Sequence, residues 1–386
     1  MVLTVLLPVI LSAGCERAAM SPPMATLSVG ELLGGADTLH ARALAPRPFT
    51  FPQDHGPHPG FRTEWWYFTG NLTADDGREL GYQLTFFRSA LLDSATYATG
   101  DGIERSPWRG RHVYLAHFAV TDGGTGELRA AEKFARGAVG LAGARAEPLR
   151  VWLEDWSAAS LAASAFPLRM RASADDIAID LVLEQGKPIV LHGERGLSRK
   201  GPEPGNASHY YSLTRMPTRG SVRTSAGTWS ARGASWLDRE WSTSALSPGL
   251  TGWDWLSLQL DDATELMLYR LRRADGTADP FSAATFVDRD GSSRGFTADE
   301  FVMSPMAEWR STDGVRYPVA WRVVVPALEL TLDVAASVED QELALAVRYW
   351  EGMVRADGMR GDRRVAARGY LEMTGYADRP GRMYSR

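Results

Sequence analysis

From residue 51 onward, short runs of alternating apolar and polar residues are separated by turn-forming residues. Such alternation places apolar side chains on one face of a β-strand, and Asp-Gly, Gly-Gly and Asn between the runs favour tight antiparallel turns. Sustained helical periodicity is absent, and only Gln341–Trp350 suits a strand and a short helix equally well. The pattern predicts an all-β protein with strands in Arg78–Arg88, Arg111–Thr121, Asp176–Glu184, Trp253–Asp261, Glu265–Arg272, Ala320–Val325 and Leu328–Ala335.

The second half of the chain repeats the pattern of the first half, which predicts two copies of one β unit. A single large sandwich with chance similarity is the alternative. Small antiparallel sheets hide their edges by closing into barrels, and a barrel of about eight strands can hold one small ligand. The matched segments are Glu64–Leu72 with Gly252–Leu260, Ala116–Gly123 with Ala284–Gly291, and Phe166–Leu181 with Tyr317–Leu332.

The N-terminus resembles a lipoprotein export signal. Val2–Leu11 is an apolar run too short to cross a bilayer, and small residues lead from it to Cys15, the only cysteine. We therefore expect residues 1–15 to be a signal segment, residues 16–50 a lead-in, and Cys15 an acylated membrane anchor. The expected location is the periplasm or the outer membrane. No basic residue precedes the apolar run, so a buried N-terminal segment with an incidental cysteine is the alternative.

Composition removes several function classes. The formal charge is −5, from 42 basic and 47 acidic residues without a basic cluster, which argues against a nucleic-acid partner. One cysteine excludes an internal disulfide and a thiolate metal cluster. The chain has no G-x-S-x-G, H-E-x-x-H, Walker or dinucleotide-binding motif, and His55 and His58 suit an exposed turn. No metal and no cofactor are predicted.

Glu64 stands beside Trp65, Trp66 and Tyr67, where a carboxylate is unfavourable unless it is paired, exposed or functional. Strand alternation puts Glu64 and Trp66 on one face and Trp65 and Tyr67 on the other. If Glu64 faces a cavity, its pKa rises and it can donate a proton. If it pairs with a nearby arginine such as Arg88, the cluster is structural.

A second cluster, Trp236–Trp241, encloses two carboxylates and an arginine just before the second repeat, and Asp254 takes the place of Trp66 in that repeat. The Trp236–Trp241 cluster either belongs to a ligand site between the units or forms a structural ion-pair network. His117 is either a ligand contact or a core histidine. The candidate acids are Glu64, Asp238, Glu240 and Asp254, and the candidate ligand contacts are Trp65, Trp66, Tyr67, Arg88, His117, Tyr211, Trp236, Trp241, Trp253 and Trp255.

Several blocks in order resemble the AttH/CrtC-like family, from about Phe51 to the C-terminus. The resemblance implies two lipocalin-like antiparallel β-barrel domains packed together, at residues 51–245 and 246–386. Members are often described as carotenoid 1,2-hydratases or secreted hydrolases. The blocks are Asp54–Gly56, Glu64–Gly70, Phe86–Arg88, Ala116–Ala119, Leu191–Gly193, Gly196–Gly201, Tyr210–Ser212, Trp236–Trp241 and Gly252–Trp255.

The resemblance leaves three functions to compare. The first is binding of a lipid, isoprenoid or polyene with acid-catalysed hydration, in which a protonated carboxyl in a dry pocket donates a proton and aromatic faces stabilise the cation. The second is a lipid-binding or transfer lipoprotein without turnover. Hydrolysis ranks third, because no activated nucleophile is evident. The expected partners are a hydrophobic small molecule and, through Cys15, a membrane; an export or transporter partner is not assigned.

Overall fold

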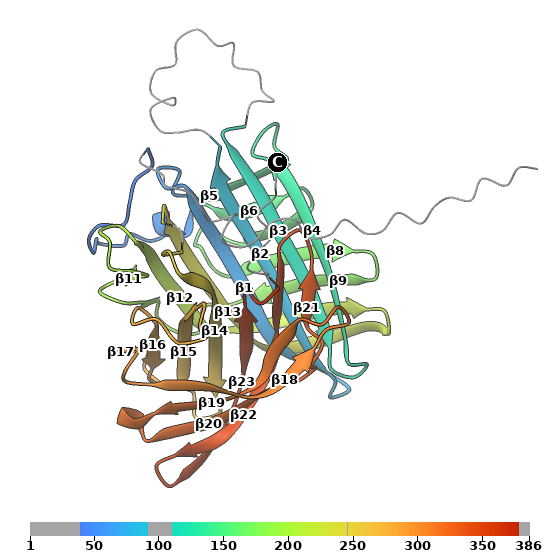
Figure 1. Ribbon diagram of the computed structural model, residues 1–386. Helices are drawn as coiled ribbons and strands as arrows, with labels where there is room; N and C mark the ends of the chain where they lie inside the picture. Colours follow the sequence, from blue (N-terminus) through green and yellow to red (C-terminus); the bar gives the residue numbers. More distant parts are fainter. Residues whose placement is uncertain (1–38, 92–109, 245, 378–386) are drawn as a thin grey trace, which may run out of the picture.

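The computed structural model describes residues 39–91, 110–244 and 246–377 (Figure 1). Cys15 and most of the lead-in lie outside these residues. In the described part the regular secondary structure is almost entirely strand, and the helical turns are the 3-10 segments η1 (Gln53–His55) and η2 (Pro326–Leu328). The all-β prediction is confirmed. Among the described residues, no helix has the length and apolar character needed to cross a membrane.

The first sheet contains 13 antiparallel strands in the order β4-β3-β2-β1-β13-β12-β9-β8-β7-β6-β5, with β10 and β11 paired to β12. Most of its neighbours are consecutive in the sequence, as in a meander. Its strands are β1 (Thr63–Ala74), β2 (Glu79–Ala90), β3 (His112–Asp122), β4 (Glu127–Arg136), β5 (Ala142–Ala146), β6 (Leu149–Leu153), β7 (Trp156–Ser160), β8 (Leu168–Ala174), β9 (Ile177–Leu183), β10 (Val190–Leu191), β11 (Leu197–Arg199), β12 (Ala207–Thr224) and β13 (Gly227–Ser242).

The second sheet contains 10 antiparallel strands in the order β17-β16-β15-β14-β23-β22-β20-β19-β18, with β21 paired to β22. The segment that suited either a strand or a helix forms β21 and the start of β22. The strands are β14 (Leu250–Leu260), β15 (Glu265–Arg273), β16 (Ala283–Val287), β17 (Ser293–Thr297), β18 (Val302–Arg310), β19 (Arg316–Val325), β20 (Leu330–Ala336), β21 (Glu342–Ala344), β22 (Arg348–Arg360) and β23 (Arg363–Met373).

Both sheets follow one connection scheme, as the sequence repeat predicts. In each sheet the first strand pairs with the last, β1 with β13 and β14 with β23. The repeat segments also fall on equivalent strands, because β3 and β16 each lie two strands from this pair, and β9 and β20 occupy matching places beyond it. The topology therefore supports two copies of one unit over a single sandwich.

Each sheet curls around its own apolar core, the first as a barrel and the second as a half-barrel. Strand alternation sends Trp66 and Phe68 into the first core and Leu256 and Leu258 into the second. A third cluster, which includes Tyr67, lies between the two sheets and joins residues of β1, β12 and β13 to residues of β14, β15, β22 and β23. Strands at this contact thus have two buried faces, one toward a core and one toward the other sheet.

Candidate active site

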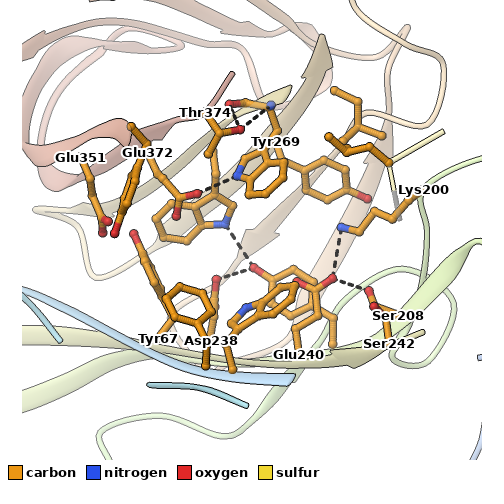
Figure 2. A pocket seen from close by; sticks show the side chains of 18 of the residues that line it. Tyr67, Lys200, Ser208, Asp238, Glu240, Ser242, Tyr269, Glu351, Glu372 and Thr374 are labelled. Atoms are coloured by element: carbon orange, nitrogen blue, oxygen red, sulfur yellow. Dashed lines mark hydrogen bonds and ion pairs between the residues drawn. The ribbon is translucent and has the colours of Figure 1, made fainter. Parts of the chain in front are cut away.

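A cavity of about 140 Å³ lies at the contact between the two sheets (Figure 2). Its wall combines aromatic side chains with a few carboxyls and one lysine. The lining residues are Trp65, Tyr67, Phe87, His117, Ser208, Tyr210, Asp238, Glu240 and Ser242 from the first sheet; Trp253, Trp255, Tyr269, Leu271, Tyr349, Glu351 and Glu372 from the second; and Lys200, Ser244, Leu246, Val347 and Thr374 from connecting segments.

Strand β13 divides the Trp236–Trp241 cluster between two environments. Asp238 and Glu240 face the cavity, whereas the alternate residues Arg239 and Trp241 face the barrel interior. Trp236 does not line the cavity itself but is buried behind it, where its indole Nε1 donates a hydrogen bond to Asp238 Oδ1 at 2.6 Å. The sequence cluster is therefore part site and part structural network.

Asp238 is a buried carboxyl held by three donors. Tyr210 Oη donates to its Oδ2 at 2.5 Å, while Ser212 Oγ and Trp236 Nε1 donate to its Oδ1. Burial raises the pKa of Asp238 to about 7, although these hydrogen bonds oppose the rise. The described residues place no cation in a salt bridge with this carboxyl. Asp238 therefore exchanges a proton near neutral pH.

Glu351 and Glu372 lie directly opposite each other on β22 and β23. Burial and the Glu372 charge raise the pKa of Glu351 well above its usual range. Burial also raises the pKa of Glu372 to about 7, although Trp253 Nε1 donates a hydrogen bond to its Oε1 at 2.8 Å. Two charged carboxylates directly opposite each other on paired strands repel each other. The pair therefore retains a proton at neutral pH.

The Glu351 carboxyl is only 1% exposed, and neither of its oxygens has a hydrogen-bond partner among the described residues. The hydroxyls of Tyr67 and Tyr349 lie near it without reaching hydrogen-bond geometry. Tyr349 Oη instead pairs with His117 Nδ1 at 2.7 Å. The acidic proton of Glu351 is thus free to point into the cavity.

The opposite side of the cavity carries Lys200 and Glu240 (Figure 2). Lys200 Nζ lies 3.6 Å from Glu240 Oε1 and 3.7 Å from the centroid of the Tyr269 ring. Ser208 Oγ donates a hydrogen bond to the same carboxylate oxygen. Burial lowers the pKa of Lys200, but the Glu240 charge and the Tyr269 contact outweigh this and raise it overall, so the side chain is an ammonium.

Glu64 does not reach the cavity. It lies inside the barrel end, where Arg88 Nε and Arg239 Nη2 form salt bridges to its two oxygens and His58 Nδ1 lies 3.2 Å away. Burial alone raises its pKa, but the Arg88 and Arg239 charges and the His58 hydrogen bond hold it well below the usual range. Glu64 is therefore paired with Arg88, as the structural alternative predicted, and does not face the cavity. With its pKa held this low, it cannot donate a proton near neutral pH.

Asp254 is also outside the cavity, because alternation on β14 turns it toward the second core while Trp253 and Trp255 face the site. Arg270 and Arg272 each form a salt bridge to it at 2.8 Å. Tyr376 Oη donates a further hydrogen bond at 2.8 Å. The carboxylate is a structural group rather than a proton donor to the cavity.

Of the aromatic candidates, Trp65, Tyr67, His117, Trp253 and Trp255 line the cavity. Burial lowers the pKa of His117 to about 3, so its imidazole is neutral. The remaining candidates, apart from Trp236, belong to the barrel interior or its end: Trp66, Arg88, Tyr211 and Trp241.

His55 and His58 do not form the exposed turn that the sequence suggests. His55 is 3% exposed and its Nδ1 pairs with Tyr211 Oη at 2.6 Å, while the His58 ring stacks on Trp241 at 3.6 Å between centroids. The segment from η1 closes the barrel end around Glu64. In the described ranges, no three His, Cys, Asp or Glu side chains group as a metal site.

Sequence reasoning missed Glu351, Glu372 and Lys200. Each glutamate is a single carboxylate within an apolar stretch, in Trp350-Glu351-Gly352 and Leu371-Glu372-Met373. A lone carboxylate between buried strand residues is a usable signal, because burial of an unpaired acid is costly without a function.

Comparison with known proteins gives the family. The model of the AttH-like family matches residues 42–376. A solved structure of a putative AttH protein from Nitrosomonas europaea is 36% identical, covers 87% of this chain and 99% of its own, and superposes with a TM-score of 0.75.

Two kievitone hydratases are more distant. The structure from Nectria haematococca is 16% identical, covers 86% of this chain and 93% of its own, and has a TM-score of 0.63, which supports the shared fold. The sequence from Fusarium solani subsp. phaseoli is 23% identical over 222 residues, or 53% of this chain. The match spans 59% of that relative's length. The family model and the 36% identical structure together show that this chain belongs to the AttH-like family.

Proposed function

We propose that the chain is a hydro-lyase that adds water to an alkene of a hydrophobic small molecule in the cavity between the sheets. The observation that carries this proposal is the placement of Glu351 directly opposite Glu372 on an aromatic cavity wall, where burial raises the pKa of both carboxyls and the described chain gives neither a salt bridge. A carboxylic acid in a dry site is the group that alkene protonation requires. The relatives described as kievitone hydratases agree with a hydration reaction.

Glu351 is the proposed proton donor, since both of its oxygens lack other partners. The alkene π electrons form a new C–H bond with the Glu351 proton at the less substituted carbon, and the O–H electron pair stays on the carboxylate. The positive charge appears on the more substituted carbon. Tyr67, Trp253 and Trp255 line the cavity, with Trp253 in contact with Glu372 and Tyr67 against Trp255, and their rings are the groups proposed to stabilise this cation.

Asp238 is the proposed base for the second half of the reaction. Water forms a C–O bond to the cation and its proton passes to the Asp238 carboxylate, which leaves a tertiary alcohol. Return of that proton to Glu351 through solvent restores the starting state, so the net change is alkene plus water to alcohol. A pKa of about 7 suits Asp238 to both accepting and releasing the proton.

The test is incubation of the purified protein with short isoprenoid alkenes in H2¹⁸O, followed by mass spectrometry of the products. We expect a tertiary alcohol that carries one ¹⁸O, and its loss in Glu351→Gln. Glu308→Gln, an exposed acid on β18, is the matched control and keeps activity. Alkenes that bind but return unchanged contradict the hydro-lyase and favour a lipid-binding or transfer protein, which the same aromatic cavity also suits.

We also propose that the protein is exported and anchored through an acylated Cys15. The small residues before this cysteine follow the apolar run at the N-terminus. Cys15→Ser removes the only thioether site, so we expect the protein to move from detergent-extracted membranes to the soluble fraction. Cell fractionation with immunoblotting measures this, and unchanged membrane association contradicts the anchor.

A further inference from the structure

The Lys200 ammonium faces the cavity although only 19% of its side chain is exposed. Its backbone N–H donates to Asn206 O at 2.9 Å, which fixes the connection after β11. Its Nζ then lies over the Tyr269 ring at 3.7 Å and near the Tyr210 ring at 5.4 Å. Lys200 is therefore held over an aromatic wall, with its charge directed at the ligand space.

Glu240 supplies an acceptor beside this donor. The separation of 3.6 Å between Lys200 Nζ and Glu240 Oε1 exceeds the range of about 2.7–3.2 Å for an N–H···O hydrogen bond. The hydrogen bond that the carboxylate accepts within the described chain comes from Ser208. Lys200 and Glu240 thus neutralise each other's charge but leave hydrogen-bonding capacity for a third group.

We infer that this pair, here called the polar end, binds a hydroxyl group of the ligand. A hydroxyl accepts a hydrogen bond from Lys200 and donates one to Glu240, so both charged groups are satisfied. A ligand carboxylate is repelled by the Glu240 charge, and a hydrocarbon leaves the hydrogen-bonding capacity of Lys200 and Glu240 unused in a partly desolvated site. The substrate class is a small unsaturated alcohol with its hydroxyl remote from the reacting alkene.

The polar end also sets the direction of the ligand. Figure 2 shows Lys200 and Glu351 on opposite sides of the aromatic space. A hydroxyl at Lys200 therefore directs the other end of the molecule toward the Glu351–Glu372 pair. A cavity of about 140 Å³ favours a short ligand. The assignment of the reacting end rests on the proposed hydration, but hydroxyl binding does not.

The test uses three probes with one carbon skeleton: citronellol, citronellic acid and 2,6-dimethyloct-2-ene. Quenching of tryptophan fluorescence reports binding because Trp65, Trp253 and Trp255 line the cavity. We expect citronellol to bind about tenfold more tightly than either of the other probes, a difference of about 1.4 kcal/mol.

Variants separate the two members of the polar end. Lys200→Met should abolish the preference for the alcohol while the hydrocarbon affinity changes by less than about threefold, and Lys200→Arg should retain the preference. Glu240→Gln should strengthen citronellic acid binding, because it removes the opposing charge. Lys133→Met, which replaces a lysine on β4 outside the cavity wall, should behave as wild type.

Equal affinities for the three probes, or a preference that survives Lys200→Met, overturn the inference. Product analysis in H2¹⁸O is scored separately. Preferred citronellol binding without ¹⁸O incorporation leaves the polar end intact and counts against hydration. Hydration with equal affinities for the three probes supports the proposed function and counts against the polar end.

Discussion

Glu64 and Glu351 are both buried glutamates, with exposed fractions of 0% and 1%, yet their neighbours shift the two pKa values in opposite directions. Arg88 and Arg239 flank Glu64 and keep it ionised. Burial raises the pKa of Glu351, and the charge of Glu372, directly opposite it, raises that pKa further. Burial alone therefore does not identify an acid catalyst; the charge of the nearest partner decides.

The first prediction concerns Glu351→Gln. Loss of a general acid typically lowers turnover by about 10²–10⁴-fold, and we expect the hydration rate to fall within this range. Gln has nearly the same shape, so the dissociation constant for an unreacted hydrocarbon should change by less than about threefold. Single-turnover rates and fluorescence titration measure the two effects. A parallel loss of binding and turnover contradicts a role in proton donation.

The second prediction concerns Asp238→Asn and pH. Burial raises the pKa of Asp238 from 3.8 to about 7, so between these values the folded state binds more protons than the unfolded state. The contribution of Asp238 to the free energy of unfolding is thus largest at low pH and falls as pH rises through this window, by at most about 1.4 kcal/mol per pH unit.

Asn does not titrate, so the stability of Asp238→Asn relative to wild type should increase between pH 4 and pH 7. Urea denaturation at several pH values measures this difference. Ser304→Ala, at an exposed position on β18 and without an ionisable side chain, should show a constant difference over the same range. A constant offset for Asp238→Asn as well contradicts the raised pKa.

At the scale of strands, alternation predicted which residues share a face but not what each face contacts. The division of Glu64 and Trp66 from Trp65 and Tyr67 is correct. Both faces of β1 are buried, because one meets the core and the other meets the second sheet. When both faces of a strand are buried, the alternation of polar and apolar residues does not show which face lines a cavity. Glu64 and Asp238 were therefore both predicted as candidate acids.

The register of β22 and β23 was beyond sequence reasoning. Glu351 and Glu372 become neighbours only because the hairpin pairs them across the sheet. A shift of one residue in that pairing places one of them on the opposite face. The alternation pattern predicted neither β22 nor β23 as a strand, and the juxtaposition depends further on the turn between Arg360 and Arg363, for which no prediction was made.

The third prediction concerns the ion pair between β1 and β2. Arg88→Met leaves the Glu64 carboxylate buried with reduced compensation, and breaking such a pair costs about 3–5 kcal/mol. We expect a lower melting temperature and a loss of unfolding free energy of this size. Arg169→Met removes an exposed salt bridge to Asp180 and should cost less than about 1 kcal/mol. Equal losses contradict the structural role of Glu64.

At the scale of the molecule, a repeated unit has produced an asymmetric site. The sequence repeat aligns His117 with Thr285, and the two residues occupy equivalent strands of different sheets. His117 lines the cavity, whereas Thr285 Oγ1 lies 3.0 Å from Nδ1 of His192. Because the units contact through faces that carry different side chains, each contributes its own groups to one site instead of forming a copy of it.

The last prediction follows from a hydrogen-bond chain that crosses between the sheets. Ser212 donates its single hydroxyl hydrogen to the Asp238 carboxylate, so it must accept from His192 Nε2 at 2.6 Å. Burial lowers the pKa of His192 to about 3, so the ring is neutral and carries one proton, on Nε2. Nδ1 is then an acceptor, and the Thr285 hydroxyl donates to it.

Thr285→Val removes this donor and allows His192 to carry its proton on Nδ1 instead. Nε2 then competes with Asp238 for the Ser212 hydrogen, so the Asp238 carboxylate loses support and its pKa should rise by about half a unit to one unit. Carboxyl ¹³C NMR of Asp-labelled protein measures the midpoint, with the signal assigned by its absence in Asp238→Asn. Thr331→Val, at an exposed position on β20, should leave the midpoint unchanged. An unshifted midpoint in Thr285→Val shows that the second sheet does not tune this acid, whereas an upward shift means that proton transfer at Asp238 depends on the contact between the sheets.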